Sequence, residues 1–412
     1  MNRRSFVLPA LMVALFLVPQ LYVPQLFAFD FGLDLANDSA LTAETDISLS
    51  QVNRARAWLN VPFGKDADLM LSGFYEFKGT LEFDSVSGTS SPLRLDLDRA
   101  EFTGSTQGVL GPSAILRYSV GRFSLSDFSS KVLSGLSDGA RVDLVLGNLA
   151  WYASAGYRGL LYKGDARSAI DTDDTDVDND DKAYFSPSRA FLGGGARLTE
   201  LLPGQDVGIE VWAQLDLDPS GTSTHTAYLE PFIEGRLGRS VRWRAFGIGE
   251  LGMGDSTFTA MAAGGLFRLS IPEVRNLRFT QSVAWASGKI GGLEAFTPIR
   301  QLPVGSASTF TFTDIVFVSL DASLSVLPGV SGSAGGGAIF RASDNQPSGT
   351  ALRADADTSY LGAELNARAS VRLSSDLSAG VSAGLFIPET GSAYPKKTPP
   401  RFTASLTATF TL

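Results

Sequence analysis

The chain has 412 residues, of which 43 are glycine, one is histidine and none is cysteine, and its formal net charge is -9. The absence of cysteine excludes a disulfide framework and thiolate metal sites. The acidic balance argues against a nucleic-acid partner. The length suits two or three soluble domains or one large barrel.

The first 28 residues have the parts of a secretory signal peptide. Arg3 and Arg4 form a basic start, the segment 6–18 is apolar, and Ala28 ends a candidate cleavage site. The weaker alternative is a retained membrane anchor, because the apolar segment is short and prolines interrupt it. We therefore expect a signal peptide over 1–28 and a single domain over 29–412, in which no later apolar run is long enough for a spanning helix.

From residue 29 onward, apolar and polar residues alternate with the period of a β-strand. In the segment 46–63, for example, Ile47, Leu49 and Leu59 share one face, and Arg54 and Arg56 lie on the other. A face that carries arginines is incompatible with a dry interior, so we expect it to line a watery lumen while the apolar face contacts lipid. The alternative is a secreted soluble β-sandwich that buries the apolar face.

The alternation predicts an all-β fold, a transmembrane antiparallel β-barrel of about eighteen strands, with sixteen as the alternative count. The strands are expected to begin near residues 29, 46, 67, 92, 113, 138, 149, 188, 206, 224, 240, 256, 276, 310, 329, 358, 376 and 401. Connections after even-numbered strands are mostly short, and most of those after odd-numbered strands are long: 83–91, 123–137, 162–187, 289–309, 342–357 and 388–400. Short turns at one rim and long loops at the other are typical of outer-membrane barrels.

Three short motifs follow one another in residues 93–146: LDLDRAEF at 95–102, SVGRF at 119–123 and DGAR at 138–141. Their order resembles porins of the alginate-export and substrate-specific (OprD-like) class, although Phe123 stands where the class usually has glutamine. The segments 360–364 and 385–388 extend the resemblance to the last strands. The resemblance implies an outer-membrane porin.

The segment 123–137 is half apolar, which is unusual for a loop exposed to water. We expect it to fold inward and narrow the pore, held by Arg122, Asp127, Asp138 and Arg141. Charged residues on the lumen face of neighbouring strands complete the predicted constriction: Arg94, Asp96, Arg117, Asp143 and Arg158. The alternative is that these charges only neutralise one another across strands.

Aspartates crowd the predicted loop 162–187, and they include Asp171, Asp173, Asp174, Asp176 and Asp178. Their spacing resembles that of calcium-binding loops, but the turning glycine and the closing glutamate are missing. The favoured interpretation is a solvated acidic loop with weak association of Ca²⁺, and the alternative is a specific calcium site.

The sequence gives no basis for catalysis. His225 is the single histidine, and it lies near Ser223 on the same strand, which is a poor arrangement for a nucleophile and its base. We therefore expect neither enzymatic activity nor a cofactor.

The final segment, 402–412, alternates without a break and carries Phe410 two residues from its end. We expect this strand to close the barrel and to bind the barrel-assembly machinery of a diderm bacterium. The predicted location is the outer membrane, with lipid as the partner of the outer face.

The predicted function is passive diffusion of small hydrophilic solutes through the lumen. Inward arginines indicate a basic track for anionic or carboxylated solutes: Arg54, Arg56, Arg94, Arg117, Arg141, Arg158, Arg242, Arg244, Arg278, Arg368 and Arg372. Inward carboxylates concentrate on other strands: Glu210, Asp216, Glu230, Glu234, Glu250 and Glu364. The alternative function is a non-conducting barrel that acts as a surface adhesin or structural anchor.

Overall fold

The computed structural model describes residues 29–83, 87–90, 94–165, 185–217, 223–254, 256–300, 303–343, 352–353, 356 and 358–412. The expected signal peptide, 1–28, lies outside these residues. The strands are β1 (Asp30–Ala43), β2 (Ile47–Phe63), β3 (Ala67–Glu82), β4 (Ser87–Ser90), β5 (Arg94–Gln107), β6 (Ala114–Ser126), β7 (Ser134–Leu146), β8 (Leu149–Tyr157), β9 (Arg189–Leu202), β10 (Gln205–Asp216), β11 (His225–Leu237), β12 (Val241–Met253), β13 (Thr257–Ile271), β14 (Leu277–Ala286), β15 (Ile315–Leu327), β16 (Val330–Arg341), β17 (Tyr360–Arg372), β18 (Leu377–Pro388) and β19 (Arg401–Thr411).

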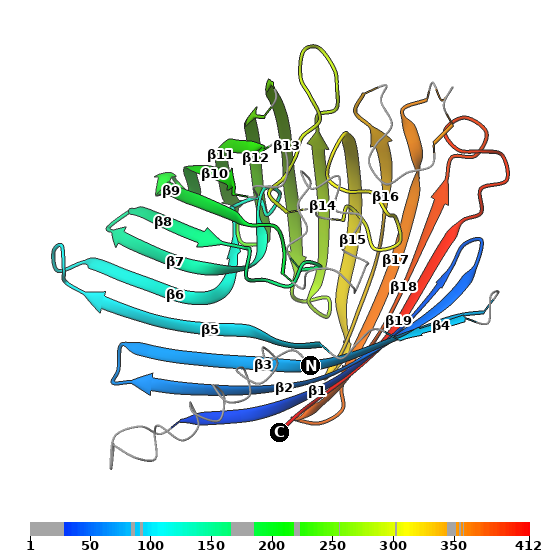
Figure 1. The fold of residues 1–412 in the computed structure, drawn as a ribbon. Helices are drawn as coiled ribbons and strands as arrows, with labels where there is room; N and C mark the ends of the chain where they lie inside the picture. Colours follow the sequence, from blue (N-terminus) through cyan, green and yellow to red (C-terminus); the bar gives the residue numbers. More distant parts are fainter. Residues whose placement is uncertain are drawn as a thin grey trace.

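The strands form one antiparallel sheet that closes on itself. β1 pairs with β2 on one side and with β19 on the other, so the blue and red ends of the sheet lie side by side in Figure 1. The short β4 pairs only with the end of β3, which also pairs with β5. The barrel wall therefore has eighteen strands, and the predicted fold and strand count are confirmed.

The two faces of the wall differ as the alternation predicts. On the outside, large apolar side chains remain exposed, as at Leu192 (56%), Val211 (51%) and Leu406 (56%). Neighbouring strands continue this belt, because residues directly opposite each other in a sheet share a face, as Val211 and Leu229 do. An apolar belt on a closed barrel is the surface that lipid requires. No helix long and apolar enough to cross a membrane occurs among the described residues.

One strand begins later than expected. The sequence placed Phe310 and Phe312 at the start of a lipid-facing strand, but β15 begins at Ile315, and both phenylalanines are 1% exposed. The Phe310 ring packs on Phe386, with the ring centroids 5.6 Å apart, and Phe312 packs on Phe296. The error has a physical reason: a segment that buries every second residue against the lumen wall has the same period as a strand facing lipid.

The hairpin of β6 and β7 extends beyond the wall. Pairing between β5 and β6 ends at Ala100 and Arg122, and pairing between β7 and β8 begins at Asp138 and Tyr157. Among the described residues, 123–126 and 134–137 therefore pair only with each other. We call residues 123–137 the inner hairpin, because its tip contacts the lumen side of the opposite wall.

Candidate functional site

The tip of the inner hairpin is shaped by Asp127. Its carboxylate accepts hydrogen bonds from the backbone N–H groups of Val132 (3.1 Å) and Leu133 (2.6 Å), and from the Ser129 hydroxyl (2.6 Å). These bonds hold a tight turn while Val132 and Leu133 are fully buried. The predicted half-apolar segment thus has an apolar core, ordered by one carboxylate.

Inward side chains of β10 and β11 receive this tip. The backbone N–H of Phe128 donates to Glu210 (2.9 Å), and that of Ser129 donates to Glu230 (3.0 Å). The Phe128 ring stacks on Phe232, with centroids 3.8 Å apart and planes 11° apart. The inner hairpin therefore crosses the lumen from its own strands to the far wall.

A second segment also lies in the lumen, and we call its described residues, 287–300 and 303–314, the inner loop. The backbone N–H of Thr297 donates to Glu250 (2.9 Å), and the Tyr228 hydroxyl donates to the Thr297 carbonyl (2.5 Å). Further along, the N–H groups of Ala307 (3.2 Å) and Ser308 (3.1 Å) donate to Glu364. The sequence placed 289–309 at the outer rim, but its contacts lie with inward carboxylates of β12 and β17.

The inner hairpin and the inner loop contact each other. The backbone N–H of Arg300 donates to the Val132 carbonyl (3.3 Å), and the Arg300 side chain donates to the Ser134 carbonyl. Lys131 lies over the Phe312 ring, 4.9 Å from its centroid. With Phe296 and Ile299 also fully buried, the two segments form one apolar-cored body, here called the partition.

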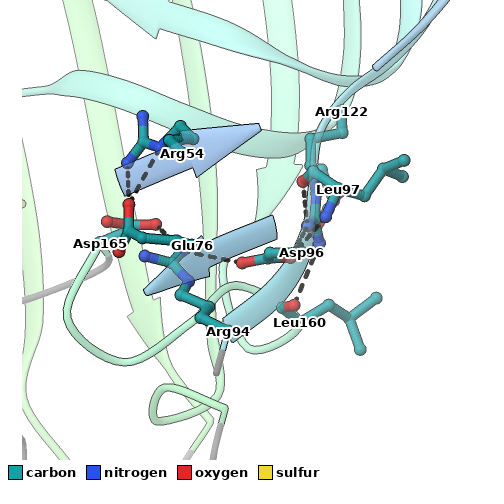
Figure 2. A network of polar contacts seen from close by, with 9 residues as sticks. Arg54, Glu76, Arg94, Asp96, Leu97, Arg122, Leu160 and Asp165 are labelled. Atoms are coloured by element: carbon teal, nitrogen blue, oxygen red, sulfur yellow. Dashed lines mark hydrogen bonds and ion pairs between the residues drawn. The ribbon is translucent and has the colours of Figure 1, made fainter. Parts of the chain in front are cut away.

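Predicted charged residues at the base of the inner hairpin form a network (Figure 2). Arg122 donates to Asp138 (2.7 and 2.9 Å), to Asp96 (3.3 Å) and to the carbonyls of Leu97 and Leu160. Arg94 pairs with Asp96 at 2.8 Å and with Asp165. Because Arg122 is almost fully buried, this network fastens the hairpin where it leaves the wall.

The other predicted residues lie apart from this network. Arg141 pairs with Asp143 (2.8 Å) and lies over the Tyr152 ring, and Arg117 faces Asp143 across the β6–β7 pair. Arg158 is buried and donates to the Ile299 carbonyl of the inner loop (3.2 Å).

Sequence reasoning missed the role of the inward glutamates. The sequence predicts only that these side chains are lumen charges. In the structure each accepts backbone hydrogen bonds from the partition: Glu210, Glu230, Glu250 and Glu364. Their alternating position on the strands signalled that they face inward. Their partners are more than forty residues away in sequence, so no local pattern identifies them.

A cavity of about 660 Å³ lies against the inner wall of β9 to β13. Five arginines line it together with Glu200, Asp206 and Glu234. We call four of these arginines the basic patch: Arg236, Arg242, Arg244 and Arg268. The strand register sets Arg236 opposite Arg242, and Arg242 opposite Arg268. Arg244 lies 5.7 Å from the Phe128 ring centroid, so the basic patch begins beside the inner hairpin.

The basic patch is poorly neutralised. Arg197 on the same cavity wall pairs with Asp206 and Glu234, but no carboxylate of the described residues lies within 4.0 Å of the four patch arginines. Like charges directly opposite each other destabilise a sheet. An anion in this cavity would offset that repulsion.

A second cavity, of about 550 Å³, is lined by residues of β2, β3, β5, the inner hairpin and the inner loop. Its charges are mixed, because Arg56 pairs with Asp98 (2.8 Å) and Arg99 with Glu101 (2.6 Å). The two sides of the lumen therefore differ in charge: the wall near β11 to β13 carries arginines that form no ion pair within the described residues, and the wall near β2 to β5 carries paired charges of both signs.

Two predicted features have separate outcomes. The aspartates Asp171, Asp173, Asp174, Asp176 and Asp178 lie outside the described residues, so calcium association stays a prediction. The ring of His225 accepts a hydrogen bond at Nδ1 from the Asp216 backbone N–H (3.1 Å), which is a structural contact between β10 and β11.

No family model matches the sequence, and no curated protein matches it. Solved structures from Pseudomonas aeruginosa do match. OccK7 (OpdD) has a TM-score of 0.59 at 11% identity, covering 93% of this chain and 98% of that chain. OccK2 (OpdF) has a TM-score of 0.58 at 12% identity, with the same coverage. OccK2 in complex with glucuronate has a TM-score of 0.56 at 11% identity, covering 93% and 96%.

These similarities are similarities of fold. They confirm that the chain has the architecture of the OprD-like outer-membrane porins that its motifs resemble. Together with the apolar belt on the closed wall, they agree with the predicted location in the outer membrane of a diderm bacterium.

Proposed function

We propose that this protein is an outer-membrane channel that passes small hydrophilic solutes by passive diffusion and favours anionic or carboxylated ones. The observation that supports this proposal is the basic patch. Its arginines line a cavity of about 660 Å³, and none of them forms an ion pair with a carboxylate of the described chain. A guanidinium binds a carboxylate through two parallel hydrogen bonds, so consecutive arginines offer a solute successive binding sites.

The partition supplies the size limit in this proposal. It fills the centre of the lumen with buried side chains and leaves the two cavities beside the wall. A solute narrow enough for these spaces meets fixed charge at close range, which is how narrow pores select ions. OccK2, which shares the fold, has been solved with glucuronate, a carboxylated sugar.

Reversal potentials of single channels under a KCl gradient test the proposal. The wild-type channel should prefer Cl⁻, and Arg268→Gln should lower the Cl⁻/K⁺ permeability ratio. Arg239→Gln is the matched control, because Arg239 is exposed in the turn between β11 and β12 and loses the same charge. Cation preference in the wild type, or equal effects of the two variants, would contradict the basic track.

The alternative is a non-conducting barrel that serves as a surface adhesin or anchor. One observation favours it: Val132, Leu133, Phe296 and Ile299 are fully buried, so the core of the partition is dry. Refolded protein that inserts into planar bilayers without conductance steps would support this alternative and reject the channel.

A further inference from the structure

Four polar side chains face outward near the middle of β1 and β2. In the strand register Asn37 lies opposite Asn53, and Ser39 lies opposite Gln51. They share a face with the exposed Leu35 (42%) and Leu49 (37%), which belong to the lipid-facing belt. These four residues form one continuous surface, here called the amide patch.

The amide patch lies deep in the apolar belt. Apolar residues continue toward both ends of the strands, with Leu41 and Ile47 on one side and Leu35 and Phe31 on the other. Asn37 is six residues from Ala43, which at about 3.3 Å per residue and a tilt of about 40° places it about 15 Å below the outer end of β1. That depth is near the middle of an apolar belt about 25 Å tall.

Such residues are rare on the outer face. Some outward positions are aromatic, and these include Tyr75 and Tyr118. In the described strands, away from the base of the inner hairpin and more than three residues from a strand end, every other outward position is apolar, aromatic or glycine, with one exception. The exception is Gln281, which lies alone on β14. The amide patch is therefore a local departure from a rule that the rest of the wall obeys.

The patch does not satisfy its own hydrogen-bonding groups. The Asn37 side-chain N–H donates to Asn53 Oδ1 (2.7 Å), and the Ser39 hydroxyl donates to Asn37 Oδ1 (3.2 Å). Within the described chain, nothing bonds to the Gln51 carboxamide or to the Asn53 N–H₂ group. Hydrocarbon offers no partner to these groups, so leaving them in lipid is costly.

A groove of about 390 Å³ borders the patch on the outer face. Asn37 and Asn53 lie on it beside the small Ala55 and Ala408, and aromatic rings of β3 form another side. The wall is thus recessed where the unsatisfied amides lie, and small residues allow a neighbouring protein to approach closely.

We infer that the amide patch is the contact surface between two copies of this chain in the outer membrane. A carboxamide both donates and accepts hydrogen bonds, so the patch is complementary to itself. A two-fold axis along the membrane normal would place the amide patch of one copy against the amide patch of the other. Two-fold symmetry is the commonest symmetry of protein homo-oligomers. Acyl chains carry no hydrogen-bonding groups, and lipid head groups do not reach this depth. The inference does not depend on the proposed channel function.

Single-cysteine crosslinking in membranes tests the inference, because the natural chain has no cysteine. The full chain with Gln51→Cys should give a disulfide-linked product of twice the chain's mass when isolated outer membranes are oxidised. Gln281→Cys is the matched control, since it replaces the other outward carboxamide on a different part of the wall. A product of another mass, a monomer only, or equal crosslinking of both variants overturns the proposal.

A second variant keeps the test independent of cysteine chemistry. Replacing Asn37, Gln51 and Asn53 together by leucine should leave a folded, heat-modifiable barrel, because leucine suits lipid. Its self-association in lipid nanodiscs, measured as the dimer fraction by mass, should weaken at least about tenfold, since the polar contacts between the two copies are lost. Unchanged association of this variant overturns the proposal.

Discussion

Removal of the Glu364 carboxylate should release one end of the inner loop. This side chain is 3% exposed and accepts hydrogen bonds from the Ser306 hydroxyl (2.8 Å) and from the backbone N–H groups of Ala307 (3.2 Å) and Ser308 (3.1 Å). The backbone N–H of Ser306 donates to it as well. Glu364→Ala therefore deletes every one of these bonds at once.

The size of the effect follows from the number of bonds. At about 1 kcal/mol net for each hydrogen bond, with lumen water replacing the carboxylate, the inner loop should lose roughly 4 kcal/mol of local stability. A change of that size raises the population of the released loop roughly a thousandfold. The barrel wall should stay intact, because its ladders do not include this side chain's carboxylate.

Amide hydrogen exchange at 306–308 and single-channel conductance measure the two consequences. Exchange of these amides should speed up by about two to three orders of magnitude, and the conductance step should rise and become noisier. Asp321→Ala is the matched control, because it removes an inward carboxylate of β15 that no described inner-loop donor reaches. Wild-type exchange and conductance in Glu364→Ala would refute the reasoning.

Three further outcomes are expected. Asp127→Ala should loosen the tip of the inner hairpin by about 2–4 kcal/mol, since Asp127 holds the turn through several hydrogen bonds, and exchange at 131–133 measures it. Gly121→Ala should lower the urea midpoint of the barrel, because Gly121 has φ of 118° and an added Cβ would lie 1.9 Å from the Ala100 carbonyl oxygen; an unchanged midpoint contradicts this. Burial raises the pKa of the Asp314 carboxyl, so the folded state binds this proton more tightly than the unfolded state. Stability should therefore fall as the pH rises from the ordinary aspartate pKa through the raised one, and Asp314→Asn should remove that fall in thermal unfolding measured across acid pH.

The wall of this barrel could be predicted from sequence because its determinants are local. Alternation along 402–412 and 46–63 places every second side chain on lipid, and the short turns fix which rim each strand end occupies. The inner hairpin was also detectable, since its apolar content is at odds with exposure to water. The strands predicted from these patterns follow one another around the barrel in the order in which they occur in the sequence.

The contents of the lumen could not be predicted in the same way. Phe310 and Phe312 have the spacing of a strand, and only their packing on Phe386 and Phe296 shows that they belong to the inner loop. An inward glutamate looks the same in sequence whether it meets water or a backbone N–H. That distinction arises from tertiary contacts across tens of residues, as between Glu364 and Ser308.

Among the described strands, residues 123–126 and 134–137 of the inner hairpin pair in the sheet only with each other. The tip contacts the rest of the barrel through side chains of β10, β11 and β12 and through the inner loop. Lengthening, shortening or replacing its tip consequently leaves all eighteen ladders undisturbed. If the proposed channel function holds, changes confined to this tip would alter which solutes pass while the barrel wall stays the same.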